Sequence, residues 1–140
     1  MAEDAPDKPK IIFYPDRAGL NKFWGKLESE ILEIIWDNGP MTVKRALFFI
    51  NHNHSYAYTT IMTVMNNLVK RGILDREKKG HSFFYNPVMG KNEFLGYAIN
   101  KIITELSNEY NPQVSTILAG ISVPVAKNKG TSRSRKKKES

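Results

Sequence analysis

Three consecutive segments of this chain repeat apolar residues at the spacing of one α-helical face, and a turn signal closes each of them. Asn38-Gly39-Pro40 ends the first segment, a polar run over residues 51–55 separates the second from the third, and Gly72 follows the third. The second and third segments therefore predict a helix-turn-helix unit. The repeating apolar positions are, in order, Leu27, Ile31, Ile34 and Ile35, then Val43, Ala46, Leu47 and Ile50, then Ile61, Val64, Met65 and Leu68.

A short β-hairpin is predicted directly after these helices. Residues 73–79 and 82–86 flank a Gly-His pair, and the run Ser-Phe-Phe-Tyr has the composition of a strand. Pro87 ends the second stretch because proline cannot continue a paired central strand. Three helices followed by a hairpin is the order of a winged helix. We therefore expect a mostly α fold with a small β-hairpin, a winged helix-turn-helix domain over residues 20–89 with the hairpin as its wing.

The next segment predicts a longer helix, over residues 92–109, whose apolar side chains cover nearly half of its circumference. One winged-helix body cannot cover that much apolar surface, so we expect burial against a second subunit. Asn-Pro at 111–112 breaks the helix, and residues 113–118 predict another short one. We assign residues 90–121 to a helical homodimerisation region. Its expected contact residues are Phe94, Leu95, Ala98, Ile99, Ile102, Ile103 and Leu106.

The 140 residues carry a formal net charge of +7, and the positive excess is concentrated in two places. Residues 41–90 hold 7 basic and 2 acidic side chains, and residues 127–140 hold 7 and 1. A basic block inside a folded region favours an oriented contact with a polyanion, although a solvated cationic surface has the same composition. Residues 1–19, with three prolines, predict a flexible arm, and the low-complexity residues 122–140 predict a disordered basic tail.

Several classes of site are excluded or disfavoured by what the sequence lacks. It has no Cys, which excludes disulfides, Cys-ligated zinc, iron–sulfur clusters and thiol nucleophiles. His52, His54 and His81 have no acidic cluster beside them, so we expect no metal and no cofactor. The sequence has no Gly-rich phosphate loop and no Gly-x-Ser-x-Gly motif, so we expect no enzyme. The lack of a long apolar run predicts a cytoplasmic protein, associated with the nucleoid and without membrane contact.

The third predicted helix carries the most informative surface. Once its apolar row is buried, the outward side is neutral and bears hydroxyls, amides and one thioether. Such groups can read base edges in a major groove, although a polar strip that only faces solvent has the same composition. Basic pairs at 44–45, 70–71 and 78–79 flank this side, as combined base and backbone contact requires. The outward residues are Tyr58, Thr59, Met62, Thr63, Asn66 and Asn67, with Thr60 at the edge.

Three blocks of the sequence stand in a familiar order. They are Leu-Glu-Ser-Glu-Ile-Leu-Glu-Ile-Ile-Trp over residues 27–36, Gly-Pro-Met-Thr-Val over 39–43, and Tyr-Thr-Thr-Ile-Met-Thr-Val-Met-Asn-Asn-Leu-Val-Lys-Arg-Gly over 58–72. Together, over about residues 20–118, they resemble the penicillinase-repressor family of bacterial winged-helix transcriptional regulators. Relatives in that family include methicillin-resistance and copper-responsive repressors.

The resemblance implies a dimeric repressor that binds a palindromic operator on double-stranded DNA and whose C-terminal helices make the dimer. In that family the third helix enters the major groove, which carries over to base contacts by Thr59, Thr60, Met62, Thr63 and Asn67. The family's wing contacts the DNA backbone. With the flanking cations, this implies backbone contacts from Lys44, Arg45, Tyr58, Lys70, Arg71, Lys78, Lys79 and His81.

The sequence also bears on induction. Copper-responsive members carry a Cys-rich motif near the C-terminus, and a chain without Cys cannot sense copper in that way. In β-lactam-linked members a membrane sensor protease cuts the dimerisation region. For this chain the sequence does not specify whether a regulatory protease or another inducer acts. We expect a sequence-specific transcriptional repressor that acts as a homodimer. The alternatives are a non-specific architectural nucleic-acid-binding protein and a winged-helix adaptor for protein contact.

Overall fold

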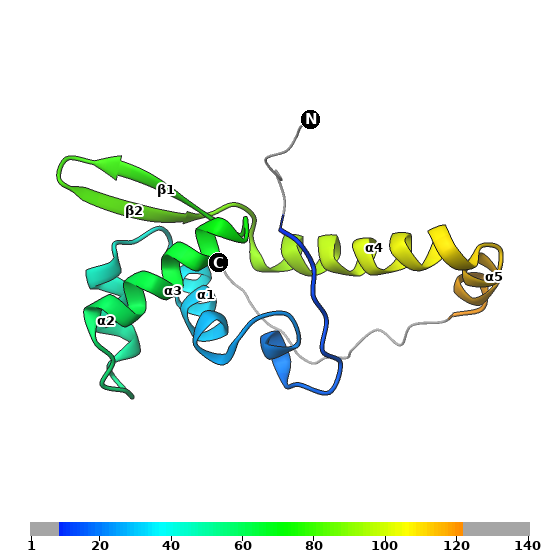
Figure 1. The fold of residues 1–140 in the computed structure, drawn as a ribbon, viewed down its shortest axis with the longest axis horizontal. Coiled ribbons are helices and arrows are strands. Elements are labelled where there is room, and N and C mark those ends of the chain that lie inside the picture. The colour runs from blue at the N-terminus through cyan, green and yellow to red at the C-terminus, as the bar shows by residue number, and fades with distance from the viewer. Residues whose placement is uncertain (1–8, 122–140) are drawn as a thin grey trace. The chain divides into compact units, whose positions relative to one another are not determined.

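The computed structural model of this chain describes residues 9–121, which form helices and one two-stranded sheet (Figure 1). Part of the predicted arm, residues 1–8, and the predicted tail over residues 122–140 lie outside the described residues. The chain divides into two compact units, Met1–Ile102 and Ile103–Ser140. The elements are the 3₁₀ helix η1 (Gly19–Lys22), α1 (Lys26–Asn38), α2 (Val43–Ile50), α3 (Tyr58–Lys70), β1 (Leu74–Lys79), β2 (Ser82–Pro87), α4 (Lys91–Tyr110) and α5 (Gln113–Gly120).

The helix ends in the first unit lie where the sequence signals predict them. Gly39 caps α1 with φ 90°, a left-handed conformation that costs a glycine little. Thr42 caps the start of α2, because its Oγ1 accepts a hydrogen bond of 3.1 Å from the backbone N–H of Arg45. The backbone N–H of Gly25 donates to Glu28 Oε1 at 2.9 Å and fixes the start of α1. The order of three helices and a hairpin confirms the predicted winged helix.

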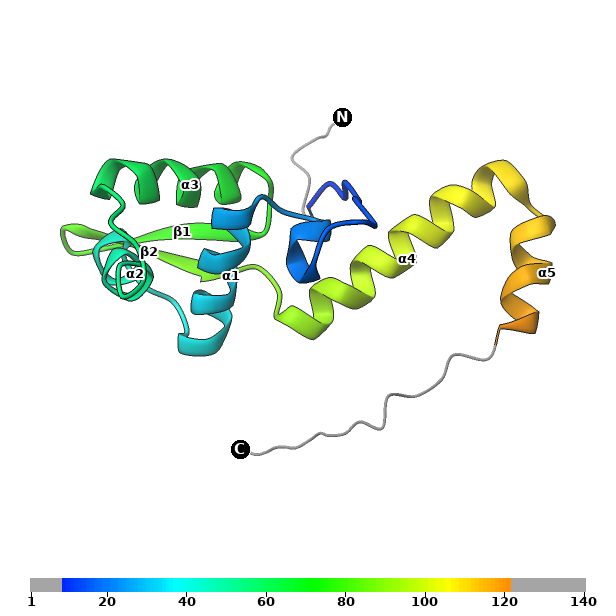
Figure 2. The same ribbon diagram turned by 90° about the horizontal axis from the view of Figure 1, so that it is seen from below.

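The hairpin runs beside α3 (Figures 1 and 2); its first strand contacts α3, and its second strand contacts α1 and α2. Its antiparallel register sets Arg76 opposite Tyr85 and Lys78 opposite Phe83. Tyr85 is 2% exposed and also exchanges two backbone hydrogen bonds, of 2.8 and 3.2 Å, with Met41. Met41 lies between α1 and α2, so this bridge attaches the wing to the helical layer.

One hydrophobic core lies between the three helices, the hairpin and the start of α4. Each helix supplies the apolar row that its sequence spacing predicts. Trp24, which precedes α1, is 2% exposed and belongs to the same core. Trp36 is half-buried and donates its indole N–H to the Met89 carbonyl at 2.9 Å. The fully buried apolar side chains of the three helices include Ile31, Leu32, Ile35, Ala46, Ile61, Met65 and Leu68.

The first half of α4 belongs to this core, which corrects two of the predicted dimer contacts. Phe94 and Ala98 are 0% exposed within the single chain. The Phe94 ring lies 5.3 Å from the Phe23 ring and 5.5 Å from the Trp24 ring, measured between centroids. An aromatic ring so enclosed has no surface left for a second subunit. Leu95 and Ile102 pack partly against the same core, whereas Ile99 is 55% exposed.

The N-terminal segment packs in its described part, where the sequence predicts a flexible arm. Pro9 is buried, and its carbonyl accepts a hydrogen bond of 2.8 Å from the hydroxyl of Tyr97 on α4. The Phe13 ring lies 5.3 Å from the Phe23 ring, and Arg17 covers the Tyr14 ring at 3.8 Å. The composition of this segment did not predict this packing, because the contacts of Pro9 and Phe13 are made with residues later in the chain.

The second unit, in its described part, consists of the end of α4 and all of α5. No residue between 103 and 121 is fully buried. Its large apolar side chains are exposed to a degree that is unusual for a monomeric protein: Leu106 45%, Tyr110 55%, Ile117 62%, Leu118 39% and Ile121 51%. No helix within residues 9–121 is both long and apolar enough to cross a membrane.

Because Phe94 fills the centre of an aromatic cluster, replacing it should destabilise the winged helix strongly. We expect Phe94→Ala to lower the free energy of unfolding by about 3–5 kcal/mol. Phe48→Ala is the matched control, since the Phe48 side chain is 57% exposed, and it should cost less than about 1 kcal/mol. Urea unfolding followed by tryptophan fluorescence measures both variants. Equal losses would contradict the assignment of Phe94 to the core.

Candidate nucleic-acid interface

Helix α3 presents two polar rows outside its buried row. Ile61, Met65 and Leu68 are 0% exposed and fix the rotation of the helix about its axis. One outer row, at i, i+4 and i+8, consists of Thr59, Thr63 and Asn67, all exposed, with Thr60 and Lys70 also exposed beside it. A second row with the same spacing consists of Tyr58, Met62 and Asn66, of which the last two are half-buried. The sequence predicted one outward face, and the structure divides it into an open row and a partly covered row.

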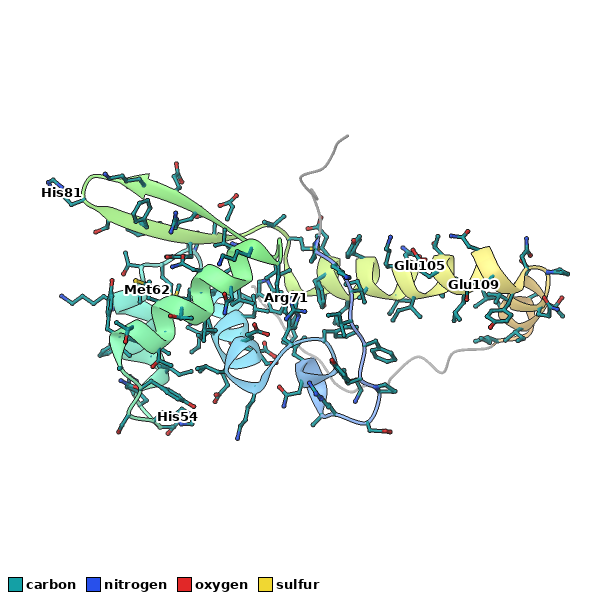
Figure 3. The ribbon with its side chains drawn as sticks, viewed as in Figure 1. His54, Met62, Arg71, His81, Glu105 and Glu109 are labelled. Carbon is teal, nitrogen blue, oxygen red and sulfur yellow. The ribbon has the colours of Figure 1, made fainter. Side chains whose placement is uncertain are left out.

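The partly covered row lines a cleft of about 370 Å³ between α3, the start of α2 and the hairpin. Lys44 and Arg76 bring two positive charges to this cleft, and none of the described residues that line it is acidic. Met62 and His81, which are labelled in Figure 3, lie on α3 and at the tip of the hairpin. The lining residues are Thr42, Val43, Lys44, Tyr58, Met62, Asn66, Arg76, His81, Ser82, Phe83 and Tyr85.

A hydrogen-bonded group joins the wing to α3 inside the cleft. The Tyr85 hydroxyl donates to Asn66 Oδ1 at 2.8 Å, and Nη1 of Arg76 donates to the same oxygen at 3.1 Å. The Arg76 guanidinium also covers the Phe83 ring at 4.5 Å. Arg76 is not among the site residues predicted from the sequence. Strand alternation was the available signal, because it puts Arg76 on the same face of β1 as the buried Leu74.

The remaining cations lie around the two polar rows. Lys78 and Lys79 are exposed on the wing, and Lys79 Nζ is 4.0 Å from Glu77 Oε1, an exposed pair of little strength. Arg45 covers the rings of Phe48 and Phe49 at 5.5 and 5.0 Å, which holds its charge near the start of α2. Lys70 is exposed at the end of α3. The surface thus combines neutral hydroxyls and amides with flanking cations, which suits a nucleic-acid duplex.

A family model described as penicillinase repressor matches residues 24–128. This chain belongs to the penicillinase repressor family. Among its relatives, the penicillinase repressor of Bacillus licheniformis is 21% identical over 81 residues, which make up 58% of this chain and 63% of that protein. The transcriptional regulator BlaI of Mycobacterium tuberculosis is 29% identical over 72 residues, 51% of this chain and 52% of that protein. The chain therefore spans between half and two thirds of the length of these relatives.

The match confirms the family predicted from the sequence blocks. The matched range includes the residues that line the cleft and the outer row of α3. An uncharacterised protein of Latilactobacillus sakei is 27% identical over 79 residues, 56% of this chain and 54% of that protein. The roles of single residues in this penicillinase-repressor-family chain rest on their geometry, because family membership assigns none of them.

Arg71 differs from the other predicted DNA-backbone contacts, because its half-buried guanidinium contacts other groups of the same chain. Nη1 donates to Glu28 Oε1 at 2.9 Å and Nη2 to the Phe23 carbonyl at 3.3 Å. The guanidinium also lies over the Trp24 ring, 4.1 Å from its centroid. Arg71 marks the end of α3 that is far from His81 at the wing tip (Figure 3). The sequence counted Arg71 as an outward cation because it adjoins Lys70, but one residue on a helix turns the side chain by about 100°.

The histidines occupy separate environments. His54 Nε2 lies 3.2 Å from Glu30 Oε2, and His52 Nδ1 lies 3.0 Å from the Phe48 carbonyl. His54 and His81 lie on opposite sides of α3 in Figure 3. Within residues 9–121 no group of three or more His, Asp or Glu side chains is close enough to hold a metal ion. Two glutamates of α1 form ion pairs, Glu28 with Arg71 and Glu33 with Lys91.

The neighbours Lys70 and Arg71 provide a test of this division between surface and interior. We expect Arg71→Met to lower the free energy of unfolding by about 1–3 kcal/mol, because it removes a half-buried ion pair and a cation–π contact. Lys70→Met, the same change of charge at an exposed position, should cost within about 0.5 kcal/mol. Chemical unfolding of the two variants in parallel measures the difference. If both variants are as stable as the wild type, Arg71 has no internal role.

Proposed function

We propose that this chain is a sequence-specific transcriptional repressor that binds an operator on double-stranded DNA as a homodimer. The observation that carries the proposal is the open, neutral row of α3 beside a cleft whose described lining bears Lys44 and Arg76 and no acidic residue. Hydroxyl and amide groups on a helix can donate to and accept from base edges, and the surrounding cations can bind phosphates. Membership of the penicillinase repressor family supports the same function.

In this proposal α3 lies in the major groove and its open row reads the bases. Hydroxyls and an amide can bond to base edges, and the methyl groups of threonine can contact a thymine methyl. Met62 reaches bases from the cleft side of the helix, where its thioether is half-buried. The proposed base-reading residues are Thr59, Thr60, Met62, Thr63 and Asn67.

The backbone contacts come from the elements around α3. The start of α2, the end of α3 and the wing each carry exposed cations, which fix the position of the protein on the duplex without reading sequence. Arg71 is left out of this set, because its guanidinium pairs with Glu28. The proposed backbone contacts are Lys44, Arg45, Tyr58, Lys70, Lys78, Lys79 and His81.

The homodimer is proposed from apolar surface that the single chain leaves open. Ile99 and Leu106 on α4 are 55% and 45% exposed, and Leu95, Ile102 and Ile103 are half-buried on the same helix. Exposed apolar residues at helical spacing favour burial against a second copy. A two-fold symmetric pair would place two α3 helices on two half-sites, which predicts a palindromic operator. Phe94 and Ala98 take no part in this interface, because they are fully buried in the chain.

Selection of bound genomic fragments in the presence of excess bulk DNA tests this function directly. We expect repeated recovery of fragments that share one inverted repeat, each bound by two copies of the chain, because only a sequence reader keeps a preferred site under competition. Recovery that ignores sequence would instead favour an architectural nucleic-acid-binding protein. Failure to retain any fragment at moderate salt would favour an adaptor for protein contact. Either of these outcomes contradicts the proposal.

The open row predicts a discrimination defect from one small change. Thr63→Ala should lose about 1–3 kcal/mol of discrimination at one base position of the recovered operator, because the hydroxyl that contacts that base is gone. Thr104→Ala on α4 is the matched control, an exposed threonine outside the proposed interface. Competition binding against every single base-pair substitution of the operator gives the profile. An unchanged profile for Thr63→Ala would argue against the placement of α3 in the groove.

A further inference from the structure

The side-chain amide of Asn66 has an orientation that chemistry fixes. Two groups contact its Oδ1 atom, the Tyr85 hydroxyl at 2.8 Å and Nη1 of Arg76 at 3.1 Å. Arginine carries only donors, so the amide atom that faces Arg76 must be the oxygen. A flip of the amide would bring its N–H groups against the guanidinium and lose the bond to Arg76, although the Tyr85 hydroxyl could still accept from the amide. Asn66 is therefore held with its oxygen toward the wing.

The two donors that hold Asn66 are themselves held. Tyr85 is 2% exposed, and its backbone exchanges hydrogen bonds of 2.8 and 3.2 Å with Met41. Arg76 lies opposite Tyr85 in the hairpin register and covers the Phe83 ring at 4.5 Å. The amide is thus fixed by the core and by the wing together, and the rotamer of Asn66 depends on the wing staying beside α3.

The nitrogen of this amide, Nδ2, carries two N–H donors, and both are available. Within residues 9–121 no group accepts a hydrogen bond from Asn66 Nδ2, although the side chain is half-buried and lines the cleft. This nitrogen is not among the buried unpaired side-chain atoms of the described residues, so an occupant of the cleft can reach its N–H groups. Lys44, in the same lining, adds positive charge. The occupant that fits is a group that offers only acceptors.

We propose that Asn66 presents a donor of fixed polarity to an acceptor on the bound duplex, which makes it a specificity-determining residue where that acceptor is a base, a statement that rests on the proposed DNA binding. A free asparagine pairs with adenine by donating and accepting at once. Asn66 cannot do so, because its oxygen is already occupied. It selects acceptors, either a base atom such as O6 or N7 of guanine, N7 of adenine or O4 of thymine, or a phosphate oxygen. It rejects a cytosine amino group, which is a donor.

Asn66→Asp tests the polarity, because aspartate has the same shape and still accepts from Tyr85 and Arg76 but replaces the donor with an acceptor. Asn100→Asp, at an exposed position of α4, is the control for the added charge. If the acceptor is a base, the ratio of affinities at one operator position should change by about 5- to 150-fold relative to this control. If it is a phosphate, affinity should fall by the same factor at all sequences relative to this control. A binding profile equal to that of Asn100→Asp would overturn the proposal.

The fixed orientation is measured without DNA, which keeps the result separate from the proposed function. In the full chain, the side-chain ¹⁵N order parameter of Asn66 should be well above that of the exposed Asn100, and Tyr85→Phe should lower it, since one of its two bonds is removed. Equal mobility of the two amides in the wild type would overturn the proposal even if the chain binds DNA. A wild-type chain that binds no preferred fragment would instead overturn the proposed function, and with it the role of Asn66 in specificity.

Discussion

The burial of one apolar row of α3 is the constraint on which the surface of this protein depends. Ile61, Met65 and Leu68 are completely enclosed by the other helices and the hairpin. Rotating the helix about its axis would expose these side chains, at a cost of about 1.5–3 kcal/mol for each one. The core thus decides which residues of α3 face outward. The open row and the cleft row follow from this one rotation.

The second constraint is the attachment of the wing. Tyr85 connects the hairpin to Met41 by backbone hydrogen bonds and to Asn66 by its hydroxyl. A two-stranded hairpin alone is marginally stable in water, so these contacts give the wing its place beside α3. The same tyrosine therefore positions the strand and also orients a polar group in the cleft.

Sequence periodicity was sufficient to predict the helices, but it did not predict which residues from distant parts of the chain contact them. The turn signal at Gly39 predicted the end of α1, because a helix cap depends on residues within one turn. The internal role of Arg71 was missed, since its partner Glu28 is 43 positions away. The sequence predicts Phe94 as a dimer contact for a related reason. An apolar helix face shows that something covers it, but not whether the cover is a second subunit or aromatic rings from the same chain.

The sequence by itself determined the winged-helix order of elements, the family and the polar side of α3, because each is encoded in local spacing and residue type. Only the tertiary structure decided which polar groups remain free. Asn66 and Asn67 are adjacent and chemically identical, yet the oxygen of Asn66 is held by the wing while Asn67 is exposed. The physical reason is that a hydrogen bond requires both partners within about 3 Å. No local pattern in the sequence specifies that Arg76 and Tyr85 meet Asn66 at that distance.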